Sequence, residues 1–385
     1  MSKKKKILIF IDWFLPGYKA GGPIRSVANI IEHLSNEFEF EIVTSNTDYS
    51  EKEPYKNIES DKWVSFQKNV FVFYFSEKNF SAQNLKKLIK NTDFDIAYIN
   101  GIYSFRFSIL PLYFLKKTRK KIIVASRGML SKHAFSSKSF KKSLFLKAAK
   151  LFGLYKKVVF QATEPKEADD IKKIIKKYKT IFVVPNLPKK IKNQTLRRKK
   201  KDKGILKLAS IARISPEKNT LFALEILNQF QFSGKIVFDL YGSVHNENYW
   251  RQCKQIIENL PKNIGVNFNG SIESEKVFDI FSDAHFAFMP SQGENFGHSI
   301  LESFSAGCPV IISDQTPWRN LEEKQIGWDI ALSDKQKFRD VIQKCIDMKQ
   351  DEYDIMSKNA FNFAKEFAEN PEIKDAYFKL FNVFS

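Results

Sequence analysis

The stretch of sequence that decides the fold spans residues 285–313 and reads HFAFMPSQGENFGHSILESFSAGCPVIIS. Its apolar runs predict one buried strand at His285–Met289 and another at Pro309–Ser313. Between them lie a glycine-bearing turn and a helix that is expected to begin near Gly297. Strand, helix and strand in this order predict parallel strands of an α/β fold.

Two carboxylates distinguish this stretch. Glu294 falls in the turn, and Glu302 lies eight residues later, about one turn into the predicted helix. Both side chains can face one crevice at the carboxyl edge of a parallel sheet, where open α/β folds bind ligands. Two acceptor groups beside a helix N-terminus suit a ligand that carries both hydroxyls and phosphates. The alternative is a surface Glu that caps the helix and a second Glu that is solvated on it.

A second motif, ASIARISPEKN at residues 209–219, follows an apolar run and leads into a predicted helix. Arg213 and Lys218 stand five residues apart in this loop, so both can reach one polyphosphate. Two fixed cations stabilise the negative charge that develops on a leaving diphosphate, and they do so without a metal ion.

Short apolar runs alternate with helical patterns along most of the chain, which predicts two Rossmann-like domains. Strands are predicted at Ile7–Ile11, Glu39–Thr44, Val70–Phe75, Ile96–Asn100, Ile122–Ser126, Val158–Ala162, Ile181–Val184, Leu206–Ala212, Lys235–Tyr241 and Val266–Gly270, besides the two named above. A basic segment with few apolar residues separates the two series. The predicted organisation is a domain at 1–187, a basic linker at 188–204, a second domain at 205–369 and a last helix at 370–385.

The stretch at residues 285–313 resembles the motif of family-4 retaining glycosyltransferases. The resemblance rests on the spacing of Glu294 and Glu302, on Asn-Phe-Gly after the first Glu and on Ala-Gly-Cys-Pro-Val-Ile after the second. This resemblance implies the GT-B fold, with two doubly wound domains facing across a cleft and a last helix that crosses back to the first domain. It implies transfer of a hexosyl or N-acetylhexosaminyl group from a nucleotide-diphosphate donor to a hydroxyl of a glycan. An undecaprenyl-linked acceptor of surface polysaccharide assembly is the expected partner.

The resemblance also implies roles for single residues. Glu302 is expected to hydrogen-bond the nucleotide ribose and Glu294 the hydroxyls of the donor sugar. Arg213 and Lys218 are expected to neutralise the leaving diphosphate, although Ala212 stands where the family usually has Gly. The backbone N–H groups expected to line the sugar and phosphate are those of Asn295, Phe296 and Gly297. Attack on the same face is expected, with the departing phosphate accepting the proton.

Further glycines border the expected donor site. Gly242 ends a predicted strand, where it permits close backbone approach to a ligand, and an ordinary turn glycine is the alternative. Gly21 and Gly22 give a floor without side chains before the first predicted helix. In the family, this glycine pair borders the cleft near diphosphate and acceptor.

Three residues are candidates for the acceptor side. Asn100 ends a predicted strand where many relatives carry His, and an amide cannot exchange a proton at neutral pH. Arg127 lies in Ser126-Arg-Gly-Met-Leu130, which resembles a segment of polysaccharide-assembling relatives, and is expected to pair with a phosphate. His133 follows closely, although a lone His on a loop is more often solvent-exposed than catalytic.

The charge is uneven along the chain. The formal net charge is +20, and no acidic residue lies between Asp95 and Glu164. Such a field attracts phosphates, anionic lipid headgroups or nucleic acid. Residues 140–152 mix Lys and apolar residues at roughly helical spacing, which suits either a membrane surface or packing on the sheet with Lys outward. We expect peripheral contact with an anionic membrane and no nucleic-acid partner.

Other sequence features bear on the expected cofactor and on the cellular compartment. Asp93-Phe-Asp95 imitates a metal-binding triplet but precedes a predicted strand rather than ending one, so we expect no metal and no cofactor. Three scattered Cys fit reduced thiols in the cytosol. No apolar run approaches the ~20 residues of a membrane span. We therefore expect a cytoplasmic protein, peripheral at the inner face of the membrane.

Three alternatives remain open. A non-catalytic sugar-nucleotide-binding subunit would keep the donor site and lack turnover. An inverting GT-B transferase or a sugar-nucleotide epimerase would differ in the anomeric form of its product. A nucleic-acid-binding protein would explain the basic first half but not the context of Glu294 and Glu302.

Overall fold

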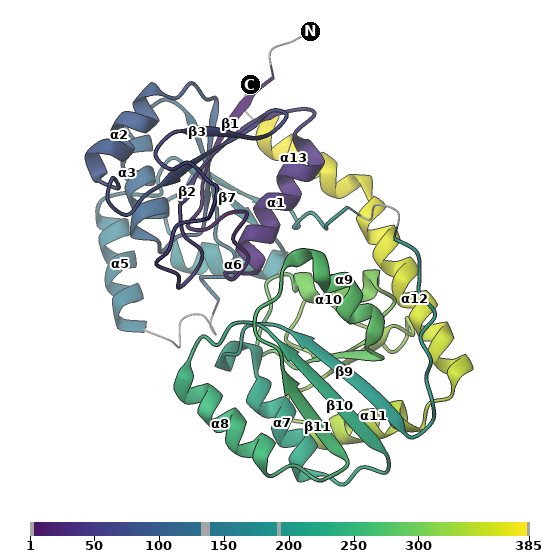
Figure 1. Ribbon diagram of the computed structural model, residues 1–385. Helices are drawn as coiled ribbons and strands as arrows, with labels where there is room; N and C mark the ends of the chain where they lie inside the picture. The colour runs from purple at the N-terminus through teal and green to yellow at the C-terminus, as the bar shows by residue number, and fades with distance from the viewer. Residues whose placement is uncertain (1–3, 132–138, 191–193, 383–385) are drawn as a thin grey trace. The chain divides into compact units, whose positions relative to one another are not determined.

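The computed structural model describes residues 4–131, 139–190 and 194–382. The chain divides into two compact units. Unit 1 comprises Met1–Lys190 with Pro371–Ser385, and unit 2 comprises Ile191–Asn370. Each unit is an α/β sandwich built on its own sheet (Figure 1).

Unit 1 is built on an eight-stranded sheet with the order β3-β4-β2-β1-β5-β6-β7-β8. Its strands are β1 (Lys6–Phe10), β2 (Glu39–Ser45), β3 (Trp63–Gln67), β4 (Val70–Phe75), β5 (Ile96–Asn100), β6 (Lys121–Ala125), β7 (Val158–Ala162) and β8 (Thr180–Val183). All pairings are parallel except that of the edge strand β3 with β4.

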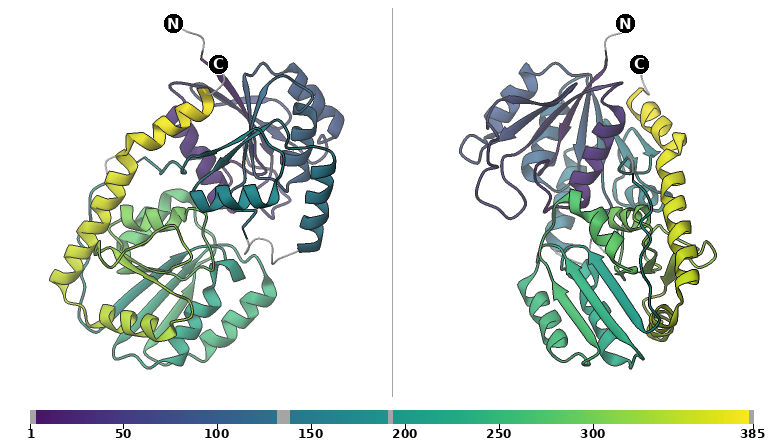
Figure 2. Two further views of the ribbon diagram at one scale, coloured as in Figure 1. Left: turned by 180° about the vertical axis from the view of Figure 1, so that it is seen from behind. Right: turned by 45° about the vertical axis from the view of Figure 1, so that its right-hand side comes forward.

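Helices cover both faces of this sheet. One face carries α2 (Ala82–Asn91), α3 (Leu110–Leu115) and α5 (Ser139–Leu151), and α6 (Pro165–Ile174) follows β7. The other carries α1 (Gly22–Leu34) and the last helix, α13 (Pro371–Asn382), which lie near each other in both views of Figure 2. Phe38, which follows α1, contacts the rings of Phe378 and Phe381. The last helix therefore completes the core of unit 1, as the GT-B expectation required.

Unit 2 is built on a six-stranded parallel sheet with the order β11-β10-β9-β12-β13-β14. Its strands are β9 (Ile205–Ile211), β10 (Lys235–Tyr241), β11 (Ile264–Phe268), β12 (Phe286–Met289), β13 (Val310–Ser313) and β14 (Gly327–Ile330). The helices α7 (Thr220–Gln229), α8 (Glu247–Glu258) and α11 (Lys335–Asp347) pack on one face. The other face carries α9 (Val277–Asp283), α10 (His298–Ser305) and α12 (Gln350–Glu369).

Every predicted strand is present, with ends within two residues of the prediction. The edge strands β3 and β14 were not predicted. Most of β3 is exposed, and β14 is short and begins at Gly327, so neither shows an apolar run. The segment that leads into α3 forms a π-helical turn at Phe105–Ile109, because Pro111 lacks the N–H that a regular helix would need there.

Residues 194–203 of the predicted basic linker at 188–204 pack on unit 2. Lys199 and Lys201 are buried, and burial lowers the pKa of both amines. Lys199 Nζ donates to the carbonyls of Ala306 and Gly307 at 3.0 and 2.9 Å, just beyond the end of α10. Lys201 Nζ likewise lies 3.3 Å from the carbonyls of Ile346 and Met348 at the end of α11. Both cations thus stabilise the negative ends of helices in unit 2.

His285, which precedes β12, fixes the same segment. Its Nε2 donates to the carbonyl of Lys200 at 2.9 Å, and its Nδ1 accepts from the backbone N–H of Lys207 at 3.1 Å. Both bonds require a neutral ring with the proton on Nε2. Burial lowers the pKa of His285 to about 4.

We predict that His285 makes unit 2 sensitive to acid. Below the unfolded-state pKa of ~6.5 the unfolded chain binds a proton that the folded chain rejects until about pH 4, so stability falls as pH drops through this range. In His285→Gln, the amide can make both hydrogen bonds without titrating. Between pH 7 and 5 the wild-type free energy of unfolding should fall by about 1–2 kcal/mol more than that of the variant in urea titrations. Equal losses would show that His285 does not contribute.

Candidate functional site

The topological switch point of unit 2 lies between β9 and β12, which are neighbours in the sheet although distant in sequence. Leu208 pairs with Phe286 and Ala209 with Ala287, so the loops that follow the two strands meet at one sheet edge. These loops are also bonded to each other. The N–H of Gln292 donates to the carbonyl of Glu217 at 2.9 Å, and Asn219 Nδ2 donates to the carbonyl of Pro290 at 3.0 Å.

An ion pair joins the two loops at this point. Lys218 Nζ lies 2.6 Å from Oε1 and 2.7 Å from Oε2 of Glu294, and the two side chains are 22% and 13% exposed. Ser291 Oγ adds a hydrogen bond of 2.8 Å to Oε1. The sequence analysis assigns Lys218 to the leaving diphosphate and Glu294 to the hydroxyls of the donor sugar. The structure brings them into direct contact, so each fixes the side chain of the other.

Arg213 supplies a second positive charge in the loop after β9. It is partly exposed and forms no salt bridge within the described ranges 4–131, 139–190 and 194–382. Its charge acts on Glu217, a carboxyl whose pKa is lowered because hydrogen bonds and nearby positive charges outweigh its burial. The guanidinium lies in the same loop as Lys218 and is available to an anionic ligand.

The turn after Glu294 is rigid. Gly297 is the N-cap of α10 with φ of 77°, and a Cβ there would meet Ile300 Cδ1 at 2.9 Å. The indole of Trp318 donates to the carbonyl of Phe296 at 2.6 Å. Among the described residues, no group accepts from the N–H of Phe296 or Gly297. These amides at a helix N-terminus can bind an anion, and the half-buried Glu302 follows within the same helix.

Gly242 acts on this site through the backbone. Its φ is 143°, and a Cβ would lie 2.0 Å from the carbonyl oxygen of Ala212. The N–H of Ala212 donates to the carbonyl of Tyr241 at 2.9 Å. The close approach that Gly242 allows is thus to the residue before Arg213, which places the cationic loop. This is a positioning role beside the predicted ligand contact.

In unit 1, Arg127 lies inside a hydrogen-bond network. Its Nε donates to Asn100 Oδ1 at 2.7 Å, one Nη donates to the hydroxyl of Tyr98 at 2.8 Å, and the other donates to Asn186 Oδ1. The Tyr98 hydroxyl in turn donates to Gln161 Oε1 at 2.6 Å, and Gln161 is bonded to Tyr377 of α13. These bonds favour a structural role for Arg127 and Asn100. Their contact with an acceptor stays a prediction.

Glu167 holds the neighbouring loops and was not singled out from the sequence. Its buried Oε1 accepts from Ser126 Oγ and the N–H of Gly128, both at 2.6 Å. Its Oε2 accepts from the N–H and Oγ1 of Thr163, both at 2.7 Å. One carboxylate therefore ties the ends of β6 and β7 together. Its position three residues after the N-cap Glu164 is a capping signal that sequence reasoning could have used.

Asp12 is a second residue that sequence reasoning missed. It follows β1, and its carboxylate accepts a hydrogen bond from Ser104 Oγ in the loop after the adjacent strand β5. Burial raises the pKa of Asp12, partly offset by this bond. The signal was its place directly after a buried apolar run.

The remaining candidates of unit 1 are Gly21, Gly22 and His133. Gly21 caps α1 with φ of 70°, and Gly22 begins the helix. His133 lies outside the described residues.

The triplet Asp93-Phe-Asp95 lies at the opposite edge of the sheet. Asp95 accepts from the N–H of Lys6 at 2.8 Å, at the amino ends of β1 and β5. Across the described part of the chain, no group of three or more His, Cys, Asp and Glu could hold a metal ion.

We predict that Gly242→Ala lowers stability and disturbs the Arg213 loop. The added Cβ would be 2.0 Å from the carbonyl oxygen of Ala212 in a backbone conformation that suits only Gly. The Tm should fall by roughly 5 °C or more. Gly265→Ala is the matched control, because a Cβ at Gly265 in β11 meets no atom within 4 Å. Thermal denaturation of both variants tests this, and equal Tm values would contradict it.

Unit 2 is similar to a known protein family, and the whole chain is similar in fold to several solved structures. Residues 191–363 match the family model described as glycosyl transferases group 1. Among solved structures, Alr3699/HepE of Anabaena in complex with UDP and glucose aligns with a TM-score of 0.70 and 14% identity, covering 99% of this chain and 100% of that chain. Sucrose-phosphate synthase of Thermosynechococcus elongatus aligns with a TM-score of 0.69 and 15% identity, covering 99% and 100%.

A third similar structure is trehalose-6-phosphate from E. coli bound with UDP-2-fluoro glucose. It aligns with a TM-score of 0.67 and 10% identity, covering 98% of this chain and 99% of that chain. No curated protein matches the sequence significantly. The likenesses show the GT-B fold, as predicted. Residues 191–363 of unit 2 thus match the glycosyl transferases group 1 family, and this match supports a glycosyltransferase enzyme.

Proposed function

We propose that this enzyme transfers a sugar, with retention of anomeric configuration, from a nucleoside diphosphate sugar to a hydroxyl of a lipid-linked glycan in surface polysaccharide assembly. The observation that carries the proposal is the Lys218–Glu294 pair at the switch point of a group 1 glycosyltransferase domain. The pair offers an ammonium and a carboxylate side by side. A donor that carries a diphosphate next to sugar hydroxyls needs both.

The division of labour follows from hydrogen-bond capacity. An ammonium has three N–H donors, and Glu294 takes two of them in the structure. A third remains for a diphosphate oxygen, and Arg213 supplies a second cation in the same loop. Glu294 orients the hydroxyls of the donor sugar, while Phe296 and Gly297 offer backbone N–H groups. Glu302 binds the ribose of the nucleotide.

The chemical step needs neither a protein base nor a metal in this proposal. The bond between the anomeric carbon and the diphosphate oxygen breaks, and the acceptor hydroxyl attacks from the same face. The departing phosphate oxygen takes the acceptor's proton, so atoms and charge balance. Lys218 and Arg213 stabilise the charge that develops on the diphosphate. The scheme is compatible with Asn100, whose amide cannot accept that proton.

Structural neighbours support the donor and the stereochemistry. Alr3699/HepE, to which this chain is 14% identical, was crystallised in complex with UDP-glucose. Trehalose-6-phosphate synthase, a similar structure with a TM-score of 0.65 and 9% identity, was studied for glycosyl transfer with retention. Both have the fold that this chain shares. They support a nucleoside diphosphate sugar and a retained configuration here.

The acceptor side is supported by a surface of unit 1 that is basic and apolar at once. Leu144, Leu151 and Phe152, on α5 and directly after it, are 60%, 81% and 70% exposed. Exposed Lys147 and Lys150 lie on the same helix, and no carboxylate occurs from residue 96 to 163. This surface fits the interface of an anionic membrane. We propose peripheral binding at the cytoplasmic face, where a lipid-linked acceptor is accessible.

In the described part of the chain, no helix is long and apolar enough to cross a bilayer.

Lys218→Ala should lower the rate of sugar transfer ~100-fold or more, since it removes an electrostatic stabiliser of the leaving group. The matched control is Lys254→Ala, which removes an exposed Lys on α8 of the same unit. Initial rates with a verified donor measure the effect, and EDTA should leave them unchanged. Turnover by Lys218→Ala equal to that of the control would refute the assigned role.

The product should keep the anomeric configuration of the donor. Proton NMR of the first product formed distinguishes the two outcomes. Inversion would favour an inverting GT-B enzyme and contradict attack on the same face.

Binding to lipid should depend on charge and on α5. The variant Lys147→Glu/Lys150→Glu should co-sediment with phosphatidylglycerol vesicles at least about 10-fold more weakly than wild type, because each basic residue contributes ~1 kcal/mol near an anionic surface. Lys176→Glu/Lys177→Glu, which changes the charge equally at exposed positions after α6, is the control. Equal losses in both variants would mean that only net charge matters.

A further inference from the structure

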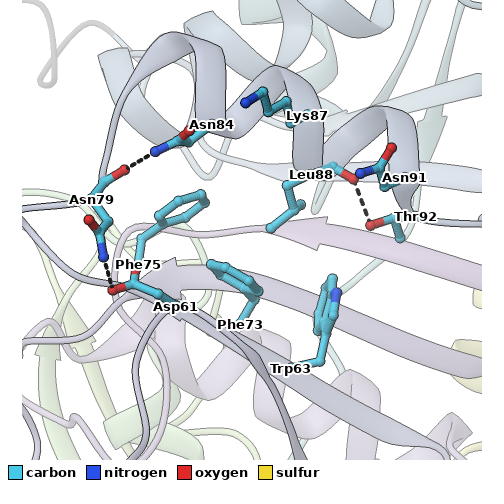
Figure 3. A pocket seen from close by; sticks show the side chains of 10 residues that line it. All are labelled: Asp61, Trp63, Phe73, Phe75, Asn79, Asn84, Lys87, Leu88, Asn91 and Thr92. Carbon is cyan, nitrogen blue, oxygen red and sulfur yellow. Dashed lines mark hydrogen bonds between the residues drawn. The ribbon is translucent and has the colours of Figure 1, made fainter.

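Unit 1 contains a pocket of about 470 Å³ between α2 and the hairpin of β3 and β4 (Figure 3). Its volume lies in the range of small-molecule sites. β4 is two strands away from β1, so the pocket is about 10 Å or more from the switch point between β1 and β5. None of the residues assigned to sugar transfer above lines it.

Three aromatic rings form one wall. Trp63 on β3 pairs directly with Phe73 on β4, so both side chains stand on the same face of the sheet. Phe75 is two residues further along β4 and shares this face. The ring centroids of Trp63 and Phe73 are 5.5 Å apart, and those of Phe73 and Phe75 are 4.7 Å apart. The three rings therefore form one continuous aromatic wall.

The opposite wall is a polar face of a helix. Asn84, Lys87 and Asn91 follow each other at spacings of three and four on α2, and Leu88 is the one large apolar residue of α2 that reaches the pocket. A helix that only packed on aromatic rings would present apolar side chains there. Figure 3 shows these side chains above the rings of Phe75, Phe73 and Trp63. Polar groups facing an aromatic wall are typical of a ligand site rather than of a core.

One end of the pocket is fixed by its own hydrogen bonds. Asp61 Oδ2 accepts from Ser76 Oγ and Asn79 Nδ2, both at 2.7 Å. Asn84 Nδ2 donates to the carbonyl of Asn79 at 2.8 Å. The hydrogen bonds therefore hold this end in one arrangement without a ligand.

Other polar groups around the pocket retain hydrogen-bonding capacity. Within the described ranges, Lys87 Nζ, the Asn91 amide and the indole N–H of Trp63 make no hydrogen bond to the protein. The ammonium and the indole N–H are hydrogen-bond donors, and the amide offers both donors and an acceptor.

We propose that this pocket binds one saccharide unit of a glycan. A pyranose has an apolar face of C–H groups that can stack on the aromatic wall, and hydroxyls around its edge that match the amides, the ammonium and the indole. A lipid chain could use the aromatic wall but none of the hydrogen-bond donors and acceptors that face it. A phosphate would meet the Asp61 carboxylate and a single cation.

The choice of a saccharide rests on the proposed function, because an enzyme that extends a glycan brings a chain of sugars to unit 1. The pocket then holds a sugar of the acceptor that is remote from the reacting hydroxyl. Such a subsite would select acceptors by length or composition rather than take part in the chemistry.

Binding can be measured without any transfer reaction. Glucose, galactose, N-acetylglucosamine and rhamnose are titrated into the full chain labelled with ¹⁵N at tryptophan, and Trp63→Phe identifies the indole signal of Trp63. At least one sugar should shift this signal saturably in the millimolar range, while the signal of Trp250 in unit 2 stays in place. In Lys87→Met/Asn91→Leu the dissociation constant should rise at least 10-fold.

Two controls make the result decisive. Lys86→Met changes an exposed Lys on the same helix that does not line the pocket and should bind as wild type does. n-Hexanol tests for an apolar occupant. The proposal is overturned if no sugar shifts the Trp63 signal, if only hexanol does, or if the double variant binds sugar as tightly as wild type. Because no donor is present, a failure of the proposed transfer activity would leave a positive binding result intact.

Discussion

The contact between Lys218 and Glu294 is the constraint on which the site in unit 2 depends. It exists because β9 and β12 are neighbours in the sheet, which brings two distant loops to one edge. The ion pair is partly buried, so its strength depends on being held by its surroundings. That support comes from the hydrogen bond of Ser291 and from the contact between Gln292 and Glu217. The close approach of Gly242 to Ala212 adds to it.

Unit 1 uses a different device for the same purpose. Glu167 accepts four hydrogen bonds from the ends of β6 and β7, and Arg127 connects Asn100 and Tyr98 to Asn186. Through Gln161 the network reaches Tyr377 of α13. The loops at the carboxyl edge of this sheet are thereby rigid. The aromatic pocket beside α2 lies outside this network.

Much of the fold follows from the sequence because buried parallel strands are short apolar runs with helical patterns between them. The strands β3 and β14 were missed because an exposed edge strand and a short strand with Gly327 lack that pattern. The contact of Lys218 with Glu294 could not be predicted, since it depends on strand order rather than on spacing. The sequence predicts a linker at Lys199 and Lys201 because it does not show that helix ends accept their ammonium groups.

The central claim is that the cations of unit 2 bind the diphosphate of a nucleotide donor. Thermal unfolding of the full chain with UDP, GDP, ADP and dTDP, each beside its monophosphate, tests this most directly. At ~100 times its dissociation constant, one diphosphate should stabilise the protein by about 2.7 kcal/mol, and its monophosphate at the same concentration by less. No stabilisation by any of the four diphosphates, or equal stabilisation by the matching monophosphate, would contradict the account.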